Sequence, residues 1–476
     1  LAQLEDFQKK LWLKKKFVVE TNYCITLDRV PEDLYPEIAA NDAQREEWVK
    51  LFAIDEIEGD ASTPGYSNPL TTEFLKANDK LVLDTRFFDD DFKARLIASI
   101  ENFDEQCDGL LIHSENFQGI RLIGNLYRCI IDSIYIDPPY NAKSSEILYK
   151  NTYKHSSWLS LIYDRINAGK NLLRSDGTHA VAIDEIEQEK LGLLIDYIFK
   201  GWSKATIPVV HNPRGQQGKN ISHVHDYVII SYPSDERKYL ADVQKKEVDS
   251  RNLRDSGTES DRTDAKNCFY PFIVKNNKIV RIGDIPADDF HPQSSNVDIG
   301  NGETEIWPMT DGGDEKKWRY ARHTVERILN KLEVKNGRSS KQIIFNKDTG
   351  TMRSLWSDAK YDASEYGTKV LQKILGKEKA KEFSYPKSIF TVTECLDVLS
   401  NEKENACFLD YFAGSGTTGH AVINLNREDG GRRKYILVEM GDYFDTVLKP
   451  RIQKVVYSKD WKDGKPKPDN EGNLNG

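Results

Sequence analysis

The segment "IDSIYIDPPYN" ends an apolar run with Asp137, Pro138, Pro139 and Tyr140. The apolar run predicts a buried β-strand, and ligands of open α/β sheets bind at the carboxyl ends of the strands. The two prolines can continue neither a central strand nor a helix, so their carbonyl groups stay free to accept hydrogen bonds. A carboxylate, a free carbonyl and an aromatic ring side by side suit a planar base with an exocyclic amino group. The alternative is a D-P-P turn that ends a strand for geometric reasons alone.

A second segment that could form a binding site is "ACFLDYFAGSGTTGHAVINL", in which Gly414, Gly416 and Gly419 satisfy G-x-G-x-x-G. A strand, a glycine turn and a helix in this order allow close backbone approach to a nucleotide or nucleoside. Glu439 ends the next apolar run, at a spacing that suits a ribose-binding acid. A phosphate loop is excluded because His420 stands where its lysine is required. A dinucleotide site and another kind of nucleoside pocket both remain open on these residues alone.

These two segments need a sheet to hold them. Between residues 81 and 232, helical patterns alternate with the apolar runs "GLLIHS", "IDSIYID", "THAVAID" and "HDYVIISY", which predicts a largely parallel α/β sheet. A polar, charge-mixed stretch without strand alternation follows, and then "ACFLDYF" and "RKYILVEM" return as buried-strand patterns. The α/β domain is therefore predicted to be interrupted. We expect a mixed α/β extension at residues 1–80 and a first catalytic part at 81–232. An inserted domain is expected at 233–382, a second part with the glycine loop at 383–457, and a polar tail at 458–476.

Composition sets limits on the class of protein. The chain has 476 residues, 38% hydrophobic and 30% charged, without an apolar run long enough to span a membrane. Its six cysteines form no C-x-x-C pair, which favours a reducing, cytoplasmic compartment and argues against a metal site. The net charge of −9 does not indicate a nucleic-acid binder, but a local basic groove would suffice. The missing initial Met and the polar end "DGKPKPDNEGNLNG" suggest an excerpt of a longer protein.

"DPPY" followed late in the chain by "FLDYFAGSGTTGHA" resembles the amino-group DNA methyltransferases of the beta class, which use S-adenosylmethionine. The segments "LIHSENFQGIRLI", "HNPRGQQGKNISHVHDYV", "FSYPKSIF" and "RIQKVVYSKDWKDGKP" are similar to the modification (Mod) subunits of type III restriction-modification systems. The resemblance covers about residues 81–466. It implies a Rossmann-like methyltransferase fold, a mostly parallel seven-stranded sheet flanked by helices, with an inserted target-recognition domain.

The resemblance also implies roles for individual residues. The catalytic residues would be Asp137, Pro138, Pro139 and Tyr140. The residues at the cofactor would be Asp410, Phe412, Gly414, Ser415, Gly416, Thr417, Lys387 and Glu439.

Four of the candidate residues have a second interpretation. Lys387 in "YPKS" could be a solvated loop lysine, and Asp184 in "AVAID" could cap a helix instead of serving the site. Arg214 and Lys219, in the loop "NPRGQQGKN", could contact DNA phosphates or belong to an ordinary solvated loop. The insert interleaves basic and aromatic residues, for example in "WPMTDGGDEKKWRYARHTVERIL", as a DNA-facing surface or a core would.

The activity implied is transfer of a methyl group from S-adenosylmethionine to the exocyclic amino group of adenine in duplex DNA, after base flipping and by direct displacement. No metal is required. Cytosine amino methylation is an alternative, although Asp rather than Ser at position 137 favours adenine. A dinucleotide oxidoreductase and a catalytically silent DNA-recognition subunit are alternatives from other classes. Duplex DNA, a separate restriction subunit with helicase and nuclease activity, and a second copy of the chain are the expected partners, without a membrane.

Overall fold

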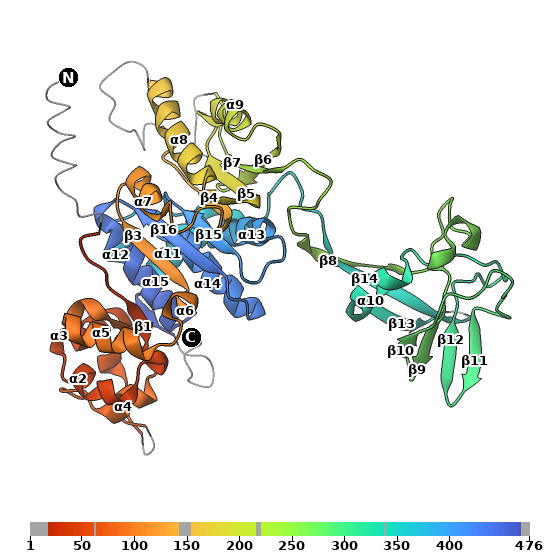
Figure 1. The fold of residues 1–476 in the computed structure, drawn as a ribbon, viewed down its shortest axis with the longest axis horizontal. Coiled ribbons are helices and arrows are strands. Elements are labelled where there is room, and N and C mark those ends of the chain that lie inside the picture. Colours follow the sequence, from red (N-terminus) through yellow and green to blue (C-terminus); the bar gives the residue numbers. More distant parts are fainter. Residues whose placement is uncertain (1–17, 61–62, 142–153, 216–219, 338, 468–476) are drawn as a thin grey trace. The chain divides into compact units, whose positions relative to one another are not determined.

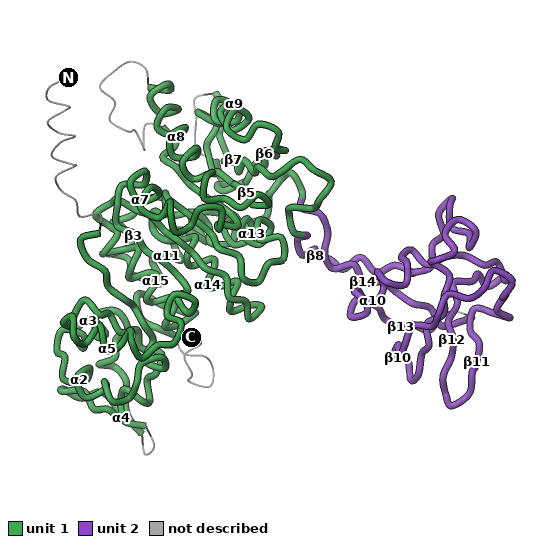
Figure 2. The backbone as a smooth tube through the Cα atoms, viewed as in Figure 1, with its two compact units in different colours: residues 1–241, 353–476 green, residues 242–352 purple. Residues whose placement is uncertain are grey.

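The computed structural model describes residues 18–60, 63–141, 154–215, 220–337 and 339–467. The chain divides into two compact units (Figure 2). The first combines residues 1–241 with residues 353–476, and the second comprises residues 242–352. The division runs inside the predicted insert at 233–382, so the segments 233–241 and 353–382 lie in the first unit.

A seven-stranded sheet forms the centre of the first unit (Figure 1). Its strands, in spatial order, are β3 (Gly109–His113), β16 (Lys434–Glu439), β15 (Cys407–Asp410), β4 (Ile131–Ile136), β5 (Leu173–Ile183), β7 (His225–Pro233) and β6 (Trp202–Val210). The pairs from β3 to β5 are parallel, and β7 runs antiparallel to both β5 and β6. The predicted mostly parallel seven-stranded sheet is confirmed. Strand β15 pairs with β4, so segments on the two sides of the insert form one sheet.

Helices cover both faces of this sheet. The helices are α7 (Asn116–Ile123), α8 (Lys154–Lys170), α9 (Gln188–Ile198), α13 (Ile389–Ser400), α14 (Thr417–Asp429) and α15 (Leu448–Tyr457). Trp158 and Ile162 of α8, spaced four residues apart, share a fully buried core with Ile134 of β4. On the opposite face, Ser133 donates from Oγ to the Leu399 carbonyl of α13 at 3.0 Å. Because neighbouring residues of a strand point to opposite faces, α8 and α13 lie on different sides of the sheet.

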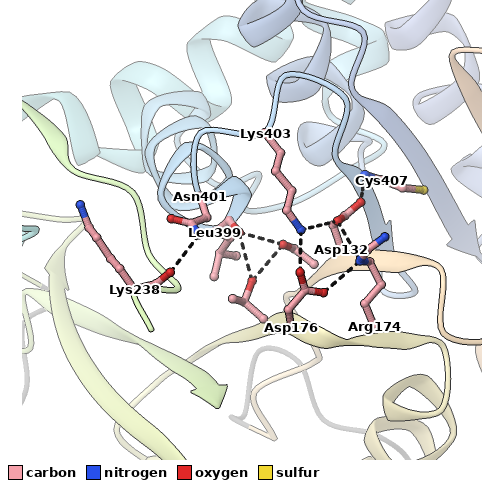
Figure 3. A network of polar contacts seen from close by, with 10 residues as sticks. Asp132, Arg174, Asp176, Lys238, Leu399, Asn401, Lys403 and Cys407 are labelled. Carbon is pink, nitrogen blue, oxygen red and sulfur yellow. Dashed lines mark hydrogen bonds and ion pairs between the residues drawn. The ribbon is translucent and has the colours of Figure 1, made fainter. Parts of the chain in front are cut away.

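A polar network joins the two sequence halves at the amino end of the sheet (Figure 3). Lys403, between α13 and β15, donates to Asp132 Oδ1 at 2.9 Å and to Asp176 Oδ2 at 3.2 Å. Arg174 pairs with Asp176 at 2.9 Å, and the Cys407 amide donates to Asp132 at 2.9 Å. The carboxylates come from β4 and β5, so the network ties the sheet together across the interruption.

The N-terminal part of the first unit is mainly helical. It contains β1 (Cys24–Thr26), η1 (Leu27–Arg29), η2 (Glu32–Leu34), α2 (Tyr35–Ala39), α3 (Asp42–Phe52), η3 (Ile54–Glu56), α4 (Thr72–Ala77), β2 (Val82–Asp84), η4 (Thr85–Phe87), α5 (Asp90–Ser99) and α6 (Phe103–Gln106). Strand β1 pairs with β2, so a boundary at residue 80 is wrong because it separates two paired strands. Asn41 caps α3 by accepting from the Gln44 amide at 3.0 Å.

The C-terminal segment packs against this N-terminal part. After α15, the strands β17 (Trp461–Lys462) and β18 (Lys465–Pro466) form a hairpin. Trp461 is buried in the same core as Phe52 and Tyr457. Description of residues 458–467 as a polar tail is therefore wrong, while residues 468–476 lie outside the described part. The remaining elements of the unit are η8 (Ala359–Tyr361), η9 (Ser364–Thr368), α11 (Lys369–Leu375), α12 (Lys377–Ala380) and η10 (Asp442–Phe444).

The second unit is rich in strands, contrary to the absence of strand alternation noted in its sequence. One antiparallel sheet has the order β10 (Lys278–Ile282), β9 (Phe272–Lys275), β12 (Glu303–Ile306), β11 (Asn296–Gly300). Another has the order β13 (Leu332–Asn336), β14 (Lys341–Gly350), β8 (Val243–Asn252). Its short helices are η5 (Arg262–Asp264), η6 (Lys266–Cys268), α10 (Arg322–Arg327) and η7 (Leu329–Lys331). Trp307 and Trp318 are buried, so the core interpretation of these tryptophans holds.

None of the described helices is long and apolar enough to cross a membrane.

Candidate active site

Three acidic residues stand at the carboxyl edge of the central sheet. Asp137 follows β4, Asp410 ends β15 and Glu439 ends β16, on adjacent parallel strands. Burial raises the pKa of Asp410 to about 7, and the charges of Asp137 and Glu439 act in the same direction. Burial also raises the pKa of Asp137. Crowding and burial thus penalise the charged forms of Asp137 and Asp410, and a cationic ligand at this edge would favour them.

Side chains from other parts of the fold hold the D-P-P-Y turn in place. The indole Nε1 of Trp158 donates to the Pro139 carbonyl at 2.7 Å. Asn141, with φ of 61°, donates from Nδ2 to Oε1 of the fully buried Glu187 at 2.6 Å. Among the described residues no donor contacts the Pro138 carbonyl. The turn is thus fixed through Pro139 and Asn141, and Asp137 and the Pro138 carbonyl keep acceptor capacity.

A lysine lies against the same turn. Lys387 contacts the Tyr140 hydroxyl, and its Nζ lies 4.5 Å from the centre of the Tyr140 ring. The ammonium is 3.7 Å from Asp137 Oδ1 and 2.7 Å from Asp226 Oδ2. The resemblance implies that Lys387 borders the cofactor, and the structure shows its contacts with the D-P-P-Y turn. Its side chain is only 15% exposed, so the solvated-loop alternative is wrong.

Asp226 and His211 complete a network that sequence reasoning missed. Nε2 of His211 lies 3.1 Å from Asp226 Oδ1, and the Tyr140 hydroxyl donates to Asp226 Oδ2 at 3.3 Å. Burial alone would raise the pKa of Asp226, but Lys387 and His211 outweigh it and hold this pKa below its usual range. Burial would lower the pKa of Lys387, and the charges of Asp137 and Asp226 raise it instead. The group is an ion cluster with Lys387 between two carboxylates.

One sequence signal could have revealed Asp226. The run "HDYVIISY" has its one acidic residue at its beginning, and a carboxylate in a buried strand needs a polar partner. Strand β7 is antiparallel to β5, so its beginning lies at the edge where the parallel strands end. Strand β6 is antiparallel to β7, so His211, which follows β6, reaches the same edge. The direction of β7 must be known before this signal can be read.

The glycine loop connects β15 to α14. Gly414 and Gly416 have φ of 53° and 81°, values at which a side chain causes strain. A Cβ at Gly414 would also lie 2.9 Å from the ring of Phe383. Glu439 shapes the loop by accepting from the amide of Gly414 at 2.8 Å. The Met440 and Gly441 amides also donate to this carboxylate, each at 2.9 Å.

Asp410 also serves the loop, accepting from the Phe412 amide at 3.0 Å and from Thr418 Oγ1 at 2.6 Å. Behind the loop, the fully buried Arg451 donates to Ser415 Oγ at 2.8 Å and to Thr417 Oγ1 at 2.9 Å. Burial lowers the pKa of Arg451 to about 9. The side chains of Ser415 and Thr417 are therefore used to hold the loop, and its backbone is what a ligand would meet.

Asp184 follows β5 at the same edge of the sheet, and its charge helps to raise the pKa of Lys387. Asp184 accepts from the Ile186 amide at 3.0 Å and α9 begins only at Gln188, so the helix-cap interpretation of Asp184 is wrong. Burial raises the pKa of Asp184 to about 6. Arg214 is exposed in the turn after β6, and Lys219 lies outside the described residues.

A mostly parallel sheet with a glycine loop and an acidic carboxyl edge defines an α/β domain built to bind a nucleoside-like ligand. The chain belongs to the DNA methylase family (N6_N4_Mtase), which matches residues 131–449, more than half of its 476 residues.

The relatives include type III and type II enzymes. The Mod subunit of the EcoPI type III restriction-modification enzyme from Escherichia phage P1 is 25% identical over 414 residues, covering 73% of this chain and 62% of the relative. The type II methyltransferase M.KpnI of Klebsiella pneumoniae is 29% identical over 340 residues, covering 65% of this chain and 75% of the relative. The EcoP15I Mod subunit of Escherichia coli is 23% identical over 390 residues, covering 70% and 58%. The chain thus spans less than two thirds of the length of the Mod relatives.

Solved structures are more distant. A crystal structure of the M1.HpyAVI–SAM complex aligns with a TM-score of 0.35 at 12% identity, covering 72% of this chain and 98% of that chain. The PvuII DNA methyltransferase (cytosine-N4-specific) aligns with a TM-score of 0.33 at 11% identity, covering 73% and 86%. Similarity at this level carries no conclusion about the site.

Proposed function

We propose that the protein transfers a methyl group from S-adenosylmethionine to the exocyclic amino group of adenine in duplex DNA. The observation that carries the proposal is Asp137, with open acceptors on its side chain and on the Pro138 carbonyl, one strand away from the glycine loop. Membership of the DNA methylase family supports it. In this proposal the chain is the modification subunit of a type III restriction-modification system, working on DNA in the bacterial cytoplasm.

The residues of the D-P-P-Y turn have distinct parts in the reaction. Asp137 and the Pro138 carbonyl accept from the two amino protons, which favours a more pyramidal nitrogen with an available lone pair. Tyr140 stacks on the flipped base and offsets part of the few kcal/mol that extrusion costs. The amino nitrogen would bond to the methyl carbon as the carbon–sulfur bond breaks, and the proton that the nitrogen then loses would pass to solvent. Because no covalent enzyme intermediate is needed, positioning supplies most of the rate enhancement.

The residues of the glycine loop suit the cofactor. When bound, S-adenosylmethionine supplies a methyl group on a sulfonium, whose sulfur keeps the bonding electron pair. The carboxylates of Asp410 and Glu439, which hold the loop by hydrogen bonds, suit this positive charge. A carboxylate accepts about four hydrogen bonds, and Glu439 already accepts three. We therefore assign Glu439 to one ribose hydroxyl, with a second bond requiring release of a loop amide.

The D-P-P-Y turn argues against a dinucleotide oxidoreductase. A dinucleotide site would use the glycine loop and Glu439 but would leave the D-P-P-Y turn, one strand away, without a role. Calorimetric titration separates the two ligands: we expect binding of S-adenosylhomocysteine and none of NAD. Tight NAD binding without a response to S-adenosylhomocysteine would overturn the proposal.

The choice of adenine rests on Asp at position 137 together with the resemblance to Mod subunits. Methylation of the cytosine amino group is the second candidate, because the two pockets share this scaffold. Incubation of duplex DNA with labelled cofactor, followed by nucleoside mass spectrometry, identifies the base. We expect N6-methyladenine. Detection of N4-methylcytosine would instead support the second candidate, methylation of cytosine.

We expect Asp137→Ala to abolish methyl transfer and to leave cofactor affinity nearly unchanged. The substitution removes an acceptor for the amino group but no contact of the glycine loop. Labelled methyl incorporation measures the first effect and calorimetry the second. Asp235→Ala, at an exposed aspartate paired with Arg237, is the matched control and should retain activity. Full activity of Asp137→Ala would refute the assigned role.

The partners follow from the proposed system. The second unit, residues 242–352, reads the recognition sequence in this proposal, and a separate restriction subunit supplies cleavage. Two copies of the chain would act together. Light scattering of the protein alone and with DNA tests the second copy, and co-purification tests the restriction subunit.

A further inference from the structure

Asp226 lies in neither motif of the proposed methyl transfer, yet its carboxylate is the centre of the ion cluster at the D-P-P-Y turn. It is 9% exposed and contacts Lys387, His211 and the Tyr140 hydroxyl. Asp226 and its three partners come from four separate segments of the chain, so the cluster depends on the folded sheet. A buried carboxylate of this kind needs a role that justifies its desolvation.

The distances around Lys387 are unequal. Its ammonium is 2.7 Å from Asp226, a hydrogen-bonded ion pair, and 3.7 Å from Asp137, too long for a hydrogen bond. Lys387 therefore lends its positive charge to Asp137 without using the acceptor oxygens of that carboxylate. Asp226 is the group that holds the ammonium at this distance.

Removal of the Asp226 charge would change the position of the Lys387 ammonium between the two carboxylates. Asp137 is the other carboxylate within ion-pair distance of Lys387 among the described residues. Without its stronger partner, the ammonium would move onto Asp137 and occupy an oxygen that the target amino group needs. Replacement of Asp226 by Asn would preserve the shape of the side chain and leave Tyr140 with a hydrogen-bonding neighbour.

We propose that Asp226 is a positioning residue for methyl transfer, which acts by holding Lys387 off the acceptor oxygens of Asp137. The inference rests on the proposed function. Asp226 need not touch the base, and its effect passes through Lys387. It follows that Asp226 matters only while Lys387 is present.

The test is a double-mutant cycle in the full chain with Asp226→Asn, Lys387→Met and the combined variant. Single-turnover methyl transfer to duplex DNA is measured with cofactor affinity by calorimetry and thermal melting. We expect Asp226→Asn alone to slow transfer by on the order of 10²-fold, the effect of a misplacement of about 1 Å. In the Lys387→Met background the same substitution should change the rate by less than about threefold.

Control variants keep the outcomes distinct. Asp235→Asn, at an exposed aspartate just after β7, should transfer methyl at the wild-type rate. If Asp226→Asn does not fold, His211→Gln removes the second partner of Asp226 and should slow transfer in the same Lys387-dependent way. Equal slowing by Asp226→Asn or His211→Gln in both backgrounds, or no slowing, overturns the inference. Absence of methyl transfer by the wild-type protein would instead overturn the proposed function.

Discussion

At the scale of single residues, the site is governed by how a few buried charges share partners. Asp137 must be ionised to accept from an amino group, although burial raises its pKa. Lys387 opposes that effect at 3.7 Å, and Asp226 prevents the ammonium from coming closer. The chemistry thus depends on a cation that is near enough to act through charge but not through a hydrogen bond.

Lys387→Met should shift the acid limb of the methyl-transfer pH profile to higher pH. Burial raises the pKa of Asp137 and Lys387 lowers it, so loss of the lysine removes the positive charge that opposes burial and raises this pKa further. Tyr140 and Asp226 also face Asp137, and neither supplies a replacement positive charge. Activity would then disappear earlier as pH falls. Single-turnover rates across the acidic range measure this.

The matched control for this shift is Lys381→Met, an exposed lysine paired with Glu378. Its acid limb should coincide with that of the wild-type protein. An acid limb of Lys387→Met that is unmoved, or moved to lower pH, would contradict the electrostatic role of Lys387.

At the scale of elements, the glycine loop and the helix that follows it need their glycines for different reasons. Gly414 has φ of 53° within the loop, whereas Gly419 lies in α14, where a Cβ would be 2.8 Å from Ile452 of α15. The first glycine serves the shape of the loop and the second serves the packing of two helices.

Gly414→Ala should weaken cofactor binding by about five- to tenfold, because a left-handed conformation costs a residue with a side chain about 1–2 kcal/mol. Gly419→Ala should leave cofactor affinity within about twofold and lower the free energy of unfolding by about 1–3 kcal/mol through overpacking. Calorimetry and urea denaturation separate the two effects. The reverse pattern would show that the loop does not bind the cofactor.

The polar network of Lys403, Asp132 and Asp176 in Figure 3 belongs to the same scale, because it connects strands that the insert separates in sequence. Lys403→Met leaves both carboxylates with fewer partners and should lower the free energy of unfolding by about 1–3 kcal/mol. A cycle with Asp176→Asn should give a coupling energy of about 0.5–3 kcal/mol. Lys369→Met, at an exposed ion pair with Glu365, is the control. Equal losses of unfolding free energy for the two lysine variants would contradict a stabilising role of the polar network.

At the scale of the whole molecule, a net charge of −9 must be reconciled with the proposed DNA substrate. The acidic edge of the sheet contributes to that charge, and it suits a cationic cofactor rather than a phosphate chain. Phosphate contacts would have to come from local basic surface, with acidic surface elsewhere.

DNA affinity should therefore fall by at least about tenfold between 50 and 200 mM salt, as counterion release requires when several phosphates are neutralised. Cofactor affinity should stay nearly constant over the same range, since it depends on a buried site. Fluorescence anisotropy with a labelled duplex and calorimetry measure the two quantities. DNA binding that is insensitive to salt would contradict a phosphate-contacting surface.

Several parts of this protein could be predicted from sequence. The glycine loop and the apolar runs that alternate with helical patterns, including those before Asp137 and Glu439, are local, and they sufficed to predict a largely parallel sheet. Parallel strands end at one edge, so acids at their carboxyl ends must come together. That rule needs no knowledge of the remaining fold.

Other parts were decided only by tertiary structure. Asp226 begins a strand instead of ending one, and it reaches the acidic edge because β7 is antiparallel to its neighbours. The insert is 242–352 rather than 233–382, because residues after 352 pack on the first unit. The commitment of Glu439 to three loop amides is likewise invisible in sequence. Strand direction, domain boundaries and shared hydrogen bonds depend on contacts between residues far apart in the chain, which no local pattern encodes.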